Sequence, residues 1–427
     1  MTVNFITFGC KVNQYESESM REELLNKGFS AADETADIFI INSCTVTKES
    51  DRKTKKTINR IRREHPNSVI VLTGCLPQSS PKIAEALDVD IVLGNTEKRD
   101  LAGAISAYLK NKQKTVIINK HEKEEAFAKY HITKFAERSR AYIKIEDGCN
   151  RGCTYCIIPK ARGRIRSRSL SEIKEESVRL SNAGFKEIVL VGINLSSYQF
   201  GLANAVKAAA LANGIKRVRL GSLEPDLTTK ELLLALKEIP EFCPQFHLAL
   251  QSGCDNTLKR MNRLYTTREF SELTKTIREI FKDASFTTDI MVGFAGETQE
   301  DFEESCEFVK KTGFLHCHIF PYSVREGTFA ANYKNQLTKA QKEERAKKMK
   351  EVCEQVSLKE RQKYIGLTKE VLLETDGSGY TKEYLRVYLN DYKENSEDFS
   401  EQNNFSGDII NVKILSVFKD GVKAEKI

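Results

Sequence analysis

The first 110 residues alternate short apolar segments with longer charged ones, a pattern that predicts α/β structure around a parallel sheet. The apolar segments have the length of strands and read VNFITFG, DIFIINS, SVIVLTG and VDIVLG. The segments between them have helical character, and one of them, KESDRKTKKTINRIRRE, is strongly basic. We therefore predict a doubly wound, Rossmann-like domain over residues 1–110 and a lysine-rich linker over 111–134.

A second alternation of apolar and amphipathic segments begins at about residue 135. Its strand-like segments read AYIKIEDG, KEIVLVGIN, KRVRLGS, FHLALQS, ASFTTDIMVGF and LHCHIFPYS. They predict either an open (βα)6 barrel or a large doubly wound sheet over residues 135–364, and periodicity alone does not choose between the two. Residues 365–427 carry short strand-like pieces separated by Gly, Asn, Asp and Ser, which predicts a small all-β barrel.

Composition narrows the class of protein further. The 427 residues are 40% hydrophobic and 30% charged, which excludes a disordered, collagenous or coiled-coil chain. No apolar run approaches the roughly 20 residues that span a bilayer, and the start MTVNFITFGC lacks the pattern of a secretory leader. We therefore expect a cytoplasmic protein with no membrane partner. Thiols stay reduced in that compartment, so grouped cysteines indicate metal binding or catalysis.

The sharpest motif is a three-cysteine loop directly after the strand-like AYIKIEDG. Cys149, Cys153 and Cys156 have the spacing C-x3-C-x2-C. Three thiolates on a short loop can hold three of the four irons of a [4Fe–4S] cluster. The open fourth iron can chelate S-adenosylmethionine (SAM), and reduction then cleaves the SAM to a carbon radical. A zinc loop is the alternative, but zinc loops usually bring four ligands.

A second group of cysteines is spread along the chain. Cys10, Cys44 and Cys75 each follow a predicted strand of the first domain. Because the carboxyl ends of parallel strands open onto one crevice, we expect these three thiols to converge. Gly9 and Gly74 would let the backbone approach a bulky inorganic ligand. The alternative is three separately buried cysteines, the common fate of a free thiol.

Other chemistry-bearing residues are weaker signals. Arg162, Arg166 and Arg168 follow the cysteine loop and could hold a carboxylate or phosphate, or form a solvated basic loop. The basic segment of residues 48–63 could bind nucleic acid or simply be an exposed helix face. His316 and His318 share one face of a predicted strand. Such a pair is more often structural, so the sequence assigns it no site.

These motifs resemble those of the methylthiotransferase branch of the radical-SAM enzymes, over essentially the full chain. The segments TFGCKVNQYESE, INSCTVT, LTGCLPQ and EDGCNRGCTYCIIPKARGRIRSRS are similar to those of bacterial enzymes that modify threonylcarbamoyladenosine in tRNA. The resemblance implies a radical-SAM barrel in the centre and a small C-terminal RNA-binding barrel called TRAM. It also implies two [4Fe–4S] clusters. Cys149, Cys153 and Cys156 would hold the radical-SAM cluster, and Cys10, Cys44 and Cys75 the auxiliary one.

The chemistry that the resemblance implies uses two SAM molecules. One methylates a sulfur on the auxiliary cluster, and the other yields a deoxyadenosyl radical that removes hydrogen from carbon 2 of the adenine. The methylthio group is then delivered to that carbon of adenosine 37, in the anticodon stem-loop of the tRNA. A flavodoxin or ferredoxin would supply the electrons.

Radical-SAM barrels usually contact their cofactor through residues at strand ends. In this chain those candidates are Gly192, Glu224, Gln251 and Gly293. The chain departs from the family pattern at Ala295, where proline is usual, and in a short loop after Tyr198. These departures concern the contacts to SAM and to substrate rather than any cysteine.

Other substrates and one other class of protein fit parts of the pattern. A methylthiotransferase that acts on isopentenyladenosine in tRNA, or on an aspartate of a ribosomal protein, would carry the same cysteines. The arginines after Pro159 favour the threonylcarbamoyl substrate, whose carboxylate needs a cation. The other class is a non-catalytic iron–sulfur protein that binds RNA or transfers electrons. That hypothesis does not explain the predicted barrel or the open coordination site on the iron.

Overall fold

The structure, a computed structural model, describes residues 1–128, 132, 139–390 and 407–427. The chain falls into two compact units. The first comprises residues 1–132, 146–168 and 323–332, and the second comprises 133–145, 169–322 and 333–427. The boundary expected at residue 135 lies outside the described residues, as does part of the linker expected over 111–134. The domain limits drawn from the sequence therefore stay a prediction.

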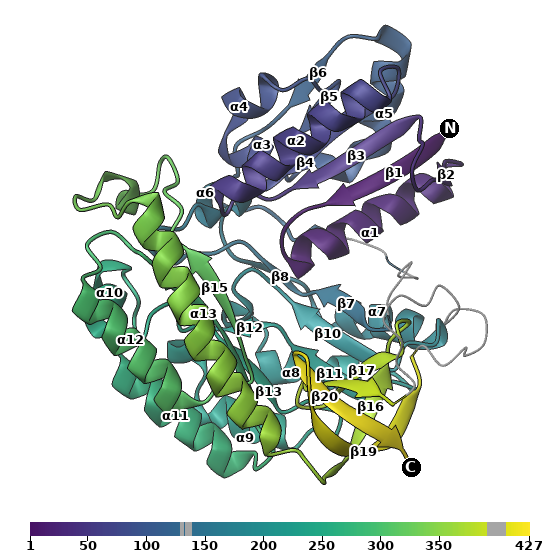
Figure 1. Cartoon of the computed structure of the whole chain (residues 1–427). Coiled ribbons are helices and arrows are strands. Elements are labelled where there is room, and N and C mark those ends of the chain that lie inside the picture. Colours follow the sequence, from purple (N-terminus) through teal and green to yellow (C-terminus); the bar gives the residue numbers. More distant parts are fainter. Residues whose placement is uncertain (129–131, 133–138, 391–406) are drawn as a thin grey trace. The chain divides into compact units, whose positions relative to one another are not determined.

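The first unit contains a parallel sheet of six strands in the order β2-β1-β3-β4-β5-β6 (Figure 1). The strands are β1 Thr2–Thr7, β2 Ser30–Ala31, β3 Ile38–Ser43, β4 Val69–Gly74, β5 Ile91–Leu93 and β6 Thr115–Ile117. The strand order reverses between β1 and β3. In open α/β sheets ligands bind at the carboxyl ends of the strands at such a switch point.

Helices cover both faces of this sheet, as a doubly wound fold requires. The helices are α1 Lys11–Asn26, α2 Lys48–Glu64, α3 Cys75–Ser79, α4 Pro81–Glu85 and α5 Leu101–Asn111. Met20 of α1 and Ile105 of α5 pack in one core cluster, whereas Ile58 of α2 and Ala84 of α4 pack in another. Pro81 begins its helix, where its missing N–H costs no hydrogen bond. The predicted Rossmann-like domain is confirmed.

Two segments from later in the chain complete the first unit. They contain α6 Ile158–Arg162, the short helical turn Phe329–Asn332, and the antiparallel pair of β8 Glu146–Asp147 with β9 Arg166–Ser167. The loop of Cys149, Cys153 and Cys156 joins β8 to α6. Both groups of cysteines therefore belong to the same compact unit.

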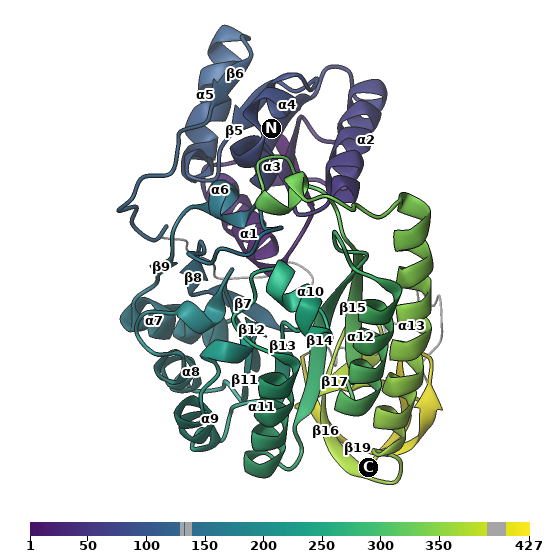
Figure 2. The same cartoon turned by 90° about the vertical axis from the view of Figure 1, so that its left-hand side faces the viewer.

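The second unit contains six parallel strand positions, which confirm the open (βα)6 barrel over the doubly wound alternative (Figure 2). They are β7 Ala141–Lys144, β10 Glu187–Val191, β11 Arg217–Leu220 continued by β12 Ser222–Leu223, β13 Gln245–Leu248, β14 Ser285–Val292 and β15 His316–Pro321. The helices are α7 Leu170–Asn182, α8 Leu202–Ala210, α9 Lys230–Lys237, α10 Asp255–Arg260, α11 Thr267–Ile280, α12 Gln299–Thr312 and α13 Lys339–Gln362. Helix α13 begins at a capping box of Thr338 with Gln341.

Side chains along the barrel strands alternate between the helices and the lumen. Phe246 of β13 and Phe286 of β14 form an aromatic cluster with Phe281, which follows α11. Because successive residues of a strand point to opposite faces, the neighbours of these phenylalanines point into the lumen. They include the polar residues His247 and Thr287.

A closed five-stranded barrel follows at the C-terminal end of the second unit. Its strands are β16 Thr368–Leu373, β17 Ser378–Thr381, β18 Arg386–Leu389, β19 Ile409–Phe418 and β20 Gly421–Lys426. The buried Arg217 of β11 donates to the carbonyl oxygens of Tyr380 (2.9 Å) and Glu370 (3.0 Å). Arg219, two residues on, bonds Glu187 at 3.0 Å and the carbonyl oxygen of Lys382 at 2.8 Å. Charged groups inside the large barrel thus hold the small one.

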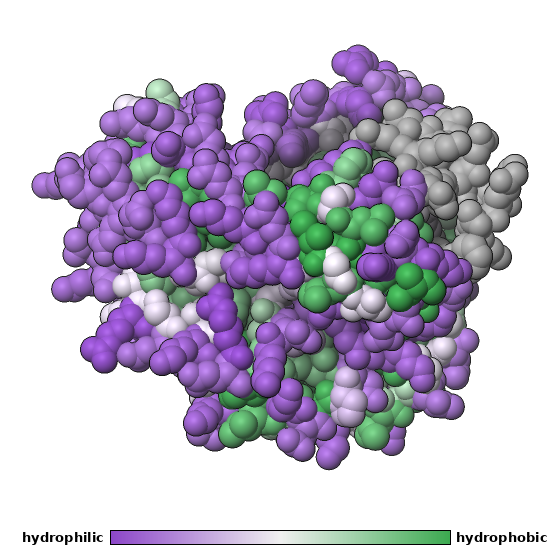
Figure 3. Space-filling view, turned by 60° about the horizontal axis from the view of Figure 1, so that its bottom comes forward, coloured by the Kyte–Doolittle hydropathy of each residue, from purple (hydrophilic) through white to green (hydrophobic). Residues whose placement is uncertain are grey.

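Hydrophilic side chains predominate on the face shown in Figure 3, with apolar ones in scattered groups. Among the residues that the structure describes, no helix is both long and apolar enough to cross a bilayer.

Candidate active site

Three cysteines lie at the carboxyl ends of three neighbouring strands in the first unit. Cys10 follows β1, Cys44 follows β3, and Cys75 begins α3 directly after β4. The first two flank the topological switch point. Burial, with contributions from the nearby thiols of Cys75 and Cys10, raises the pKa of Cys44 to about 12. The three thiols influence one another's protonation, and a metal that binds them must displace their protons.

The glycines before two of these cysteines lie where the backbone leaves no room for a side chain. Gly9 and Gly74 have φ of +105° and +99°, which L residues rarely adopt. A Cβ on Gly9 would lie 2.8 Å from the Cβ of Cys44, and one on Gly74 would lie 2.4 Å from the carbonyl oxygen of Ser43. The strand ends approach one another closely enough to form a compact set of thiol donors.

Gly74→Ala is expected to lower the free energy of unfolding by about 1–3 kcal/mol from backbone strain, with the clash against Ser43 adding to that loss. Iron bound by the first unit should fall as well, because Cys75 is the next residue. Urea denaturation and iron per chain measure the two effects. Gly28→Ala is the matched control, since Gly28 has φ of +89° but open space around it. Equal losses in both variants would mean that the backbone at Gly74 relaxes freely.

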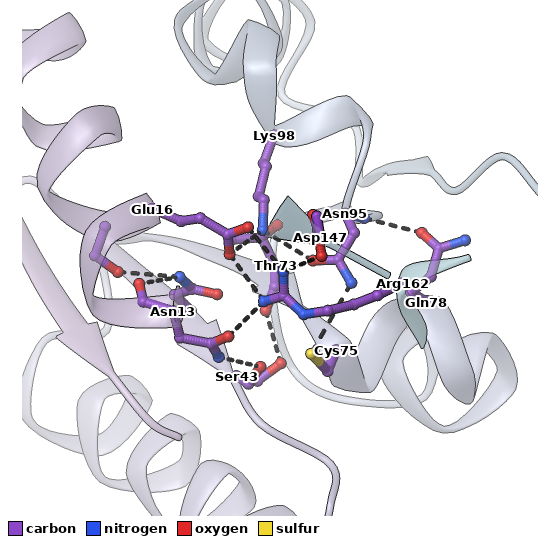
Figure 4. A network of polar contacts seen from close by, with 12 residues as sticks. Asn13, Glu16, Ser43, Thr73, Cys75, Gln78, Asn95, Lys98, Asp147 and Arg162 are labelled. Carbon is purple, nitrogen blue, oxygen red and sulfur yellow. Dashed lines mark hydrogen bonds and ion pairs between the residues drawn. The ribbon is translucent and has the colours of Figure 1, made fainter. Parts of the chain in front are cut away.

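A buried guanidinium lies beside these thiols (Figure 4). Arg162, which is 1% exposed, ends α6, the helix after the cysteine loop. It donates to both oxygens of Glu16 (2.9 and 3.0 Å), to Asn13 Oδ1 (2.6 Å) and to Asp147 Oδ1 (3.1 Å). Asn13 and Glu16 lie in the first turns of α1, directly after Cys10. The guanidinium therefore ties the helix that follows Cys10 to the helix that follows the cysteine loop.

The positive charges of Arg162 and Lys98 balance the buried carboxylates around them. Lys98 Nζ lies 2.6 Å from Glu16 Oε2 and donates to Asn95 Oδ1 at 2.8 Å. Asn95 Nδ2 in turn reaches Cys75 Sγ at 4.0 Å. Burial alone would lower the pKa of Arg162, but the Glu16 carboxylate and the Cys75 thiol, with Asp147, raise it well above its ordinary value. A fixed positive charge beside the thiols favours their thiolate form, which is the form that binds metal.

The loop of Cys149, Cys153 and Cys156 is a tight turn with partly exposed thiols. The backbone N–H of Cys149 donates to Gly163 at 3.1 Å, and that of Cys156 donates to Cys153 at 3.1 Å. The N–H of Arg151 points at Cys149 Sγ, 3.4 Å away. A cavity of about 550 Å³ opens beside Cys149. Three thiols on one short loop, an N–H directed at sulfur and open space fit a cluster with one accessible iron.

The arginines after the loop bond within their own unit. Arg166 bonds Glu125 at 2.8 Å and Asp147 at 3.3 Å, and it is 8% exposed. Arg168 is 3% exposed and donates to the hydroxyl of Tyr15 at 3.2 Å. Together with the bonds of Arg162, these contacts favour a positioning role for the arginines. Direct contact of Arg162, Arg166 or Arg168 with a substrate stays a prediction.

The four residues predicted to contact SAM follow strands of the large barrel. Gly192 follows β10, Glu224 follows β12, and Gly293 follows β14 with φ of +69°. Gln251 lies just beyond β13 with φ of +62°, and its backbone is bonded to the next strand through Asp289 and Met291. The Glu224 carboxylate is bonded to Arg263. These residues occupy the end of the barrel where such folds keep their sites, and their contact with SAM stays a prediction.

Helix α2 carries a basic face, defined here as Arg52, Lys55, Lys56, Asn59, Arg60 and Arg63. These residues line one shallow cavity of about 350 Å³ and recur with helical spacing. Glu49 pairs with Arg52, and Glu64 pairs with Arg63. No ion pair involves Lys55, Lys56 or Arg60 within the described part of the chain. The helix begins four residues after Cys44, so positive charge accumulates in the same unit as the thiols.

Comparison with known families agrees with the two groups of cysteines and the domains that carry them. Residues 143–309 match the family described as "Radical SAM superfamily", and residues 2–94 match the family described as "Uncharacterized protein family UPF0004". The fold is similar to that of the radical S-adenosylmethionine methyltransferase TsrM from Kitasatospora setae. That similarity has a TM-score of 0.56 at 13% identity and covers 75% of this chain and 74% of that one. The fold and the cysteine loop thus define a radical-SAM enzyme.

Comparison with individual relatives identifies the family within the radical-SAM enzymes. The chain is 40% identical to the threonylcarbamoyladenosine tRNA methylthiotransferase MtaB of Thermotoga maritima, over 99% of this chain and 96% of the relative. It is 34% identical to the protein of the same name from Bacillus subtilis, over 97% and 94%. The chain belongs to the radical-SAM tRNA methylthiotransferase family, as its motifs predicted.

Several residues of the site were not predicted from the sequence. Asn13, Glu16, Asn95 and Lys98 are buried and bonded around Arg162 or the thiols. One signal was available for two of them. Asn13 and Glu16 follow Cys10 with a spacing of three residues, which places both on one face of a helix.

Proposed function

We propose that this protein methylthiolates carbon 2 of threonylcarbamoyladenosine at position 37 of tRNA. The observation that carries the proposal is the convergence of Cys10, Cys44 and Cys75 at the switch point, in one compact unit with a separate three-cysteine loop. Two sets of three thiols suit a reaction that needs one cluster to generate a radical and another to deliver sulfur. The near full-length similarity to threonylcarbamoyladenosine enzymes supports this choice of substrate.

In this proposal each group of cysteines has its own cofactor. Cys149, Cys153 and Cys156 hold the radical-SAM cluster, and Cys10, Cys44 and Cys75 hold the auxiliary one. When bound, the two [4Fe–4S] clusters and SAM supply the radical chemistry and the methylthio group. Gly192, Glu224, Gln251 and Gly293 would contact SAM. Arg162 ties the helix that follows Cys10 to the helix that follows the cysteine loop, and it holds positive charge beside the Cys75 sulfur.

The partners follow from this reaction. The anticodon stem-loop of tRNA presents the target base, and the small C-terminal barrel has a fold class that on some proteins binds oligonucleotides. A flavodoxin or ferredoxin would donate electrons, and the reaction would take place in the cytoplasm. In this proposal Arg166 and Arg168 contact the substrate and supply the cation that a threonyl carboxylate needs.

The test is expression under anaerobic conditions in a host that lacks its own methylthiotransferases, followed by mass spectrometry of digested tRNA. We expect the methylthio derivative of threonylcarbamoyladenosine to appear. If only the isopentenyl derivative appears, the chemistry holds and the substrate assignment is wrong. Absence of any methylthio nucleoside, together with a methylthiolated ribosomal-protein aspartate, would move the enzyme to another branch of its family.

The basic face of α2 is expected to contribute to tRNA affinity. Arg60→Ala together with Lys56→Ala should remove two phosphate contacts, weakening binding several-fold and lowering the slope of log affinity against log salt by about 1–2. Fluorescence anisotropy with a labelled tRNA measures both quantities. Lys230→Ala together with Lys237→Ala, on α9 of the second unit, is the matched control of equal charge loss. Equal effects in both double variants would mean that α2 contributes only through the net charge of the protein.

A further inference from the structure

Three of the chain's six histidines lie on one face of the strands β13 and β15. His247 lies on β13, and His316 and His318 lie on β15. Between these strands, β14 contributes Asp289 on the same face. The three strands are parallel neighbours, side by side in Figure 2, and their opposite face packs under the helices. These four polar residues therefore point into the lumen of the large barrel.

The register brings three candidate ligand residues together. Asp289 pairs directly with His318, and His247 pairs with Thr287, two residues before Asp289 on the same face. One nitrogen of each histidine and one oxygen of Asp289 all lie within 4.8 Å of one another. Two imidazoles and one carboxylate are a donor set that suits first-row divalent metals such as zinc and iron.

The distance between two of the candidate ligand atoms is compatible with a shared metal ion. His247 Nε2 lies 3.3 Å from Asp289 Oδ2. A charge-assisted N–H···O bond in a built ion pair is shorter, about 2.7–2.9 Å. Two ligand atoms that each lie about 2.0–2.1 Å from a tetrahedral ion are about 3.3 Å apart. The spacing of the two side chains therefore fits two ligands of one ion, although ion pairs elsewhere in the structure have the same separation.

The surroundings of His247 orient it for this role. Its other ring nitrogen, Nδ1, lies 2.9 Å from Thr287 Oγ1. Thr287 Oγ1 also accepts a bond from Gln245 Nε2 at 2.9 Å, so the hydroxyl is held in place. Ligand histidines usually use their second nitrogen in this manner, which fixes the ring and directs the first nitrogen at the metal.

The site is open toward the lumen. The side chains of His247 and Asp289 are 16% and 30% exposed, and His318 is exposed. An ion can enter, and three protein ligands leave one or more coordination positions for water or another small ligand. We propose that His247, Asp289 and His318 bind a divalent transition-metal ion in the barrel lumen, separate from the six ligand cysteines. This inference does not depend on the proposed tRNA substrate.

Zinc binding to the protein with both clusters reconstituted tests the proposal. Isothermal titration calorimetry should detect one Zn²⁺ site per chain, while absorbance near the cluster bands shows that no iron is displaced. Asp289→Asn and His318→Ala should each weaken this site at least about tenfold. Thr287→Val should weaken it about 10–100-fold, as loss of a bond to a ligand histidine does.

His316→Ala is the matched control, because His316 lies on the same strand and face but outside the triad. Its ring lies against that of His318, with centroids 4.6 Å apart, so its loss should weaken Zn²⁺ binding slightly and much less than His318→Ala does. Asp289→Asn preserves the shape of the side chain, so it keeps the test valid if His318→Ala folds poorly. Absence of a Zn²⁺ site in the wild type, or a site that survives Asp289→Asn and His318→Ala, would overturn the proposal. A site lost equally in His316→Ala would overturn the assignment of these three ligands.

Discussion

Cys44→Ala is expected to abolish the methylthio nucleoside while SAM is still cleaved, and Cys153→Ala is expected to abolish both. The reason is the separation of the two sets of thiols. Cys153 lies on the loop between β8 and α6, whereas Cys44 follows β3 at the switch point of the sheet. Loss of one thiol from a set of three leaves a cluster with two protein ligands, but it leaves the other set intact.

Three measurements on the same preparations separate the two outcomes. Iron per chain should fall by about half in each variant if each set holds one [4Fe–4S] cluster. Release of deoxyadenosine should persist only in Cys44→Ala, and the methylthio nucleoside should be absent from both. Cys306→Ala, which removes a buried cysteine outside both sets, should retain all three readouts. A methylthio product from Cys44→Ala would contradict the assignment of Cys44 to the auxiliary cluster.

The central strands of the first domain were predictable because their apolar cores are continuous, whereas two short strands without such a core were not. DIFIINS and SVIVLTG became fully buried central strands, because both faces of a doubly wound sheet are covered. The strand Ser30–Ala31 is only two residues long, and Ser378–Thr381 reads SGYT, which resembles a turn. Hydrogen bonds to neighbouring strands form both. Periodicity within a segment carries no information about such partners.

Some residues of the candidate active site were predictable from the sequence, and others were not. Convergence of Cys10, Cys44 and Cys75 was predictable, because each follows a strand and parallel strands share an edge. The bond of Arg162 to Glu16 joins residues 146 positions apart, so no local pattern could predict it. An arginine near a cofactor loop indicated a substrate contact, and that contact stays a prediction. The structure adds the bonds of Arg162 to buried side chains of its own unit.

The partners of His318 also could not be predicted from a local pattern. The sequence places His318 and His316 on one predicted strand, and two histidines alone do not define a metal site. The register of β14 against β15 adds Asp289, and β13 adds His247. A strand pattern predicts which face a side chain occupies, but the partner across the sheet depends on the alignment of strands that lie far apart in sequence.

The network around Arg162 makes this residue the most sensitive position outside the cysteines. Arg162→Ala is expected to lower the free energy of unfolding by about 3–5 kcal/mol, because it leaves the buried carboxylates of Glu16 and Asp147 without their shared partner. Lys98 would still neutralise one oxygen of Glu16. Arg164→Ala, two residues along on the exposed side of the loop, should change stability by at most about 0.5 kcal/mol.

Urea denaturation of the iron-free proteins measures the loss, and hydrogen exchange in α1 and α6 shows whether it lies in the first unit. A double variant distinguishes a buried charge from lost packing. If the cost arises from an unpaired carboxylate, adding Glu16→Gln to Arg162→Ala removes that charge and should recover part of the stability, although Lys98 then loses its own partner. Strict additivity of the two changes would mean that Arg162 acts mainly through the volume it fills. Recovery would mean that balanced charge, rather than packing, holds together the helix that follows Cys10 and the helix that follows the cysteine loop.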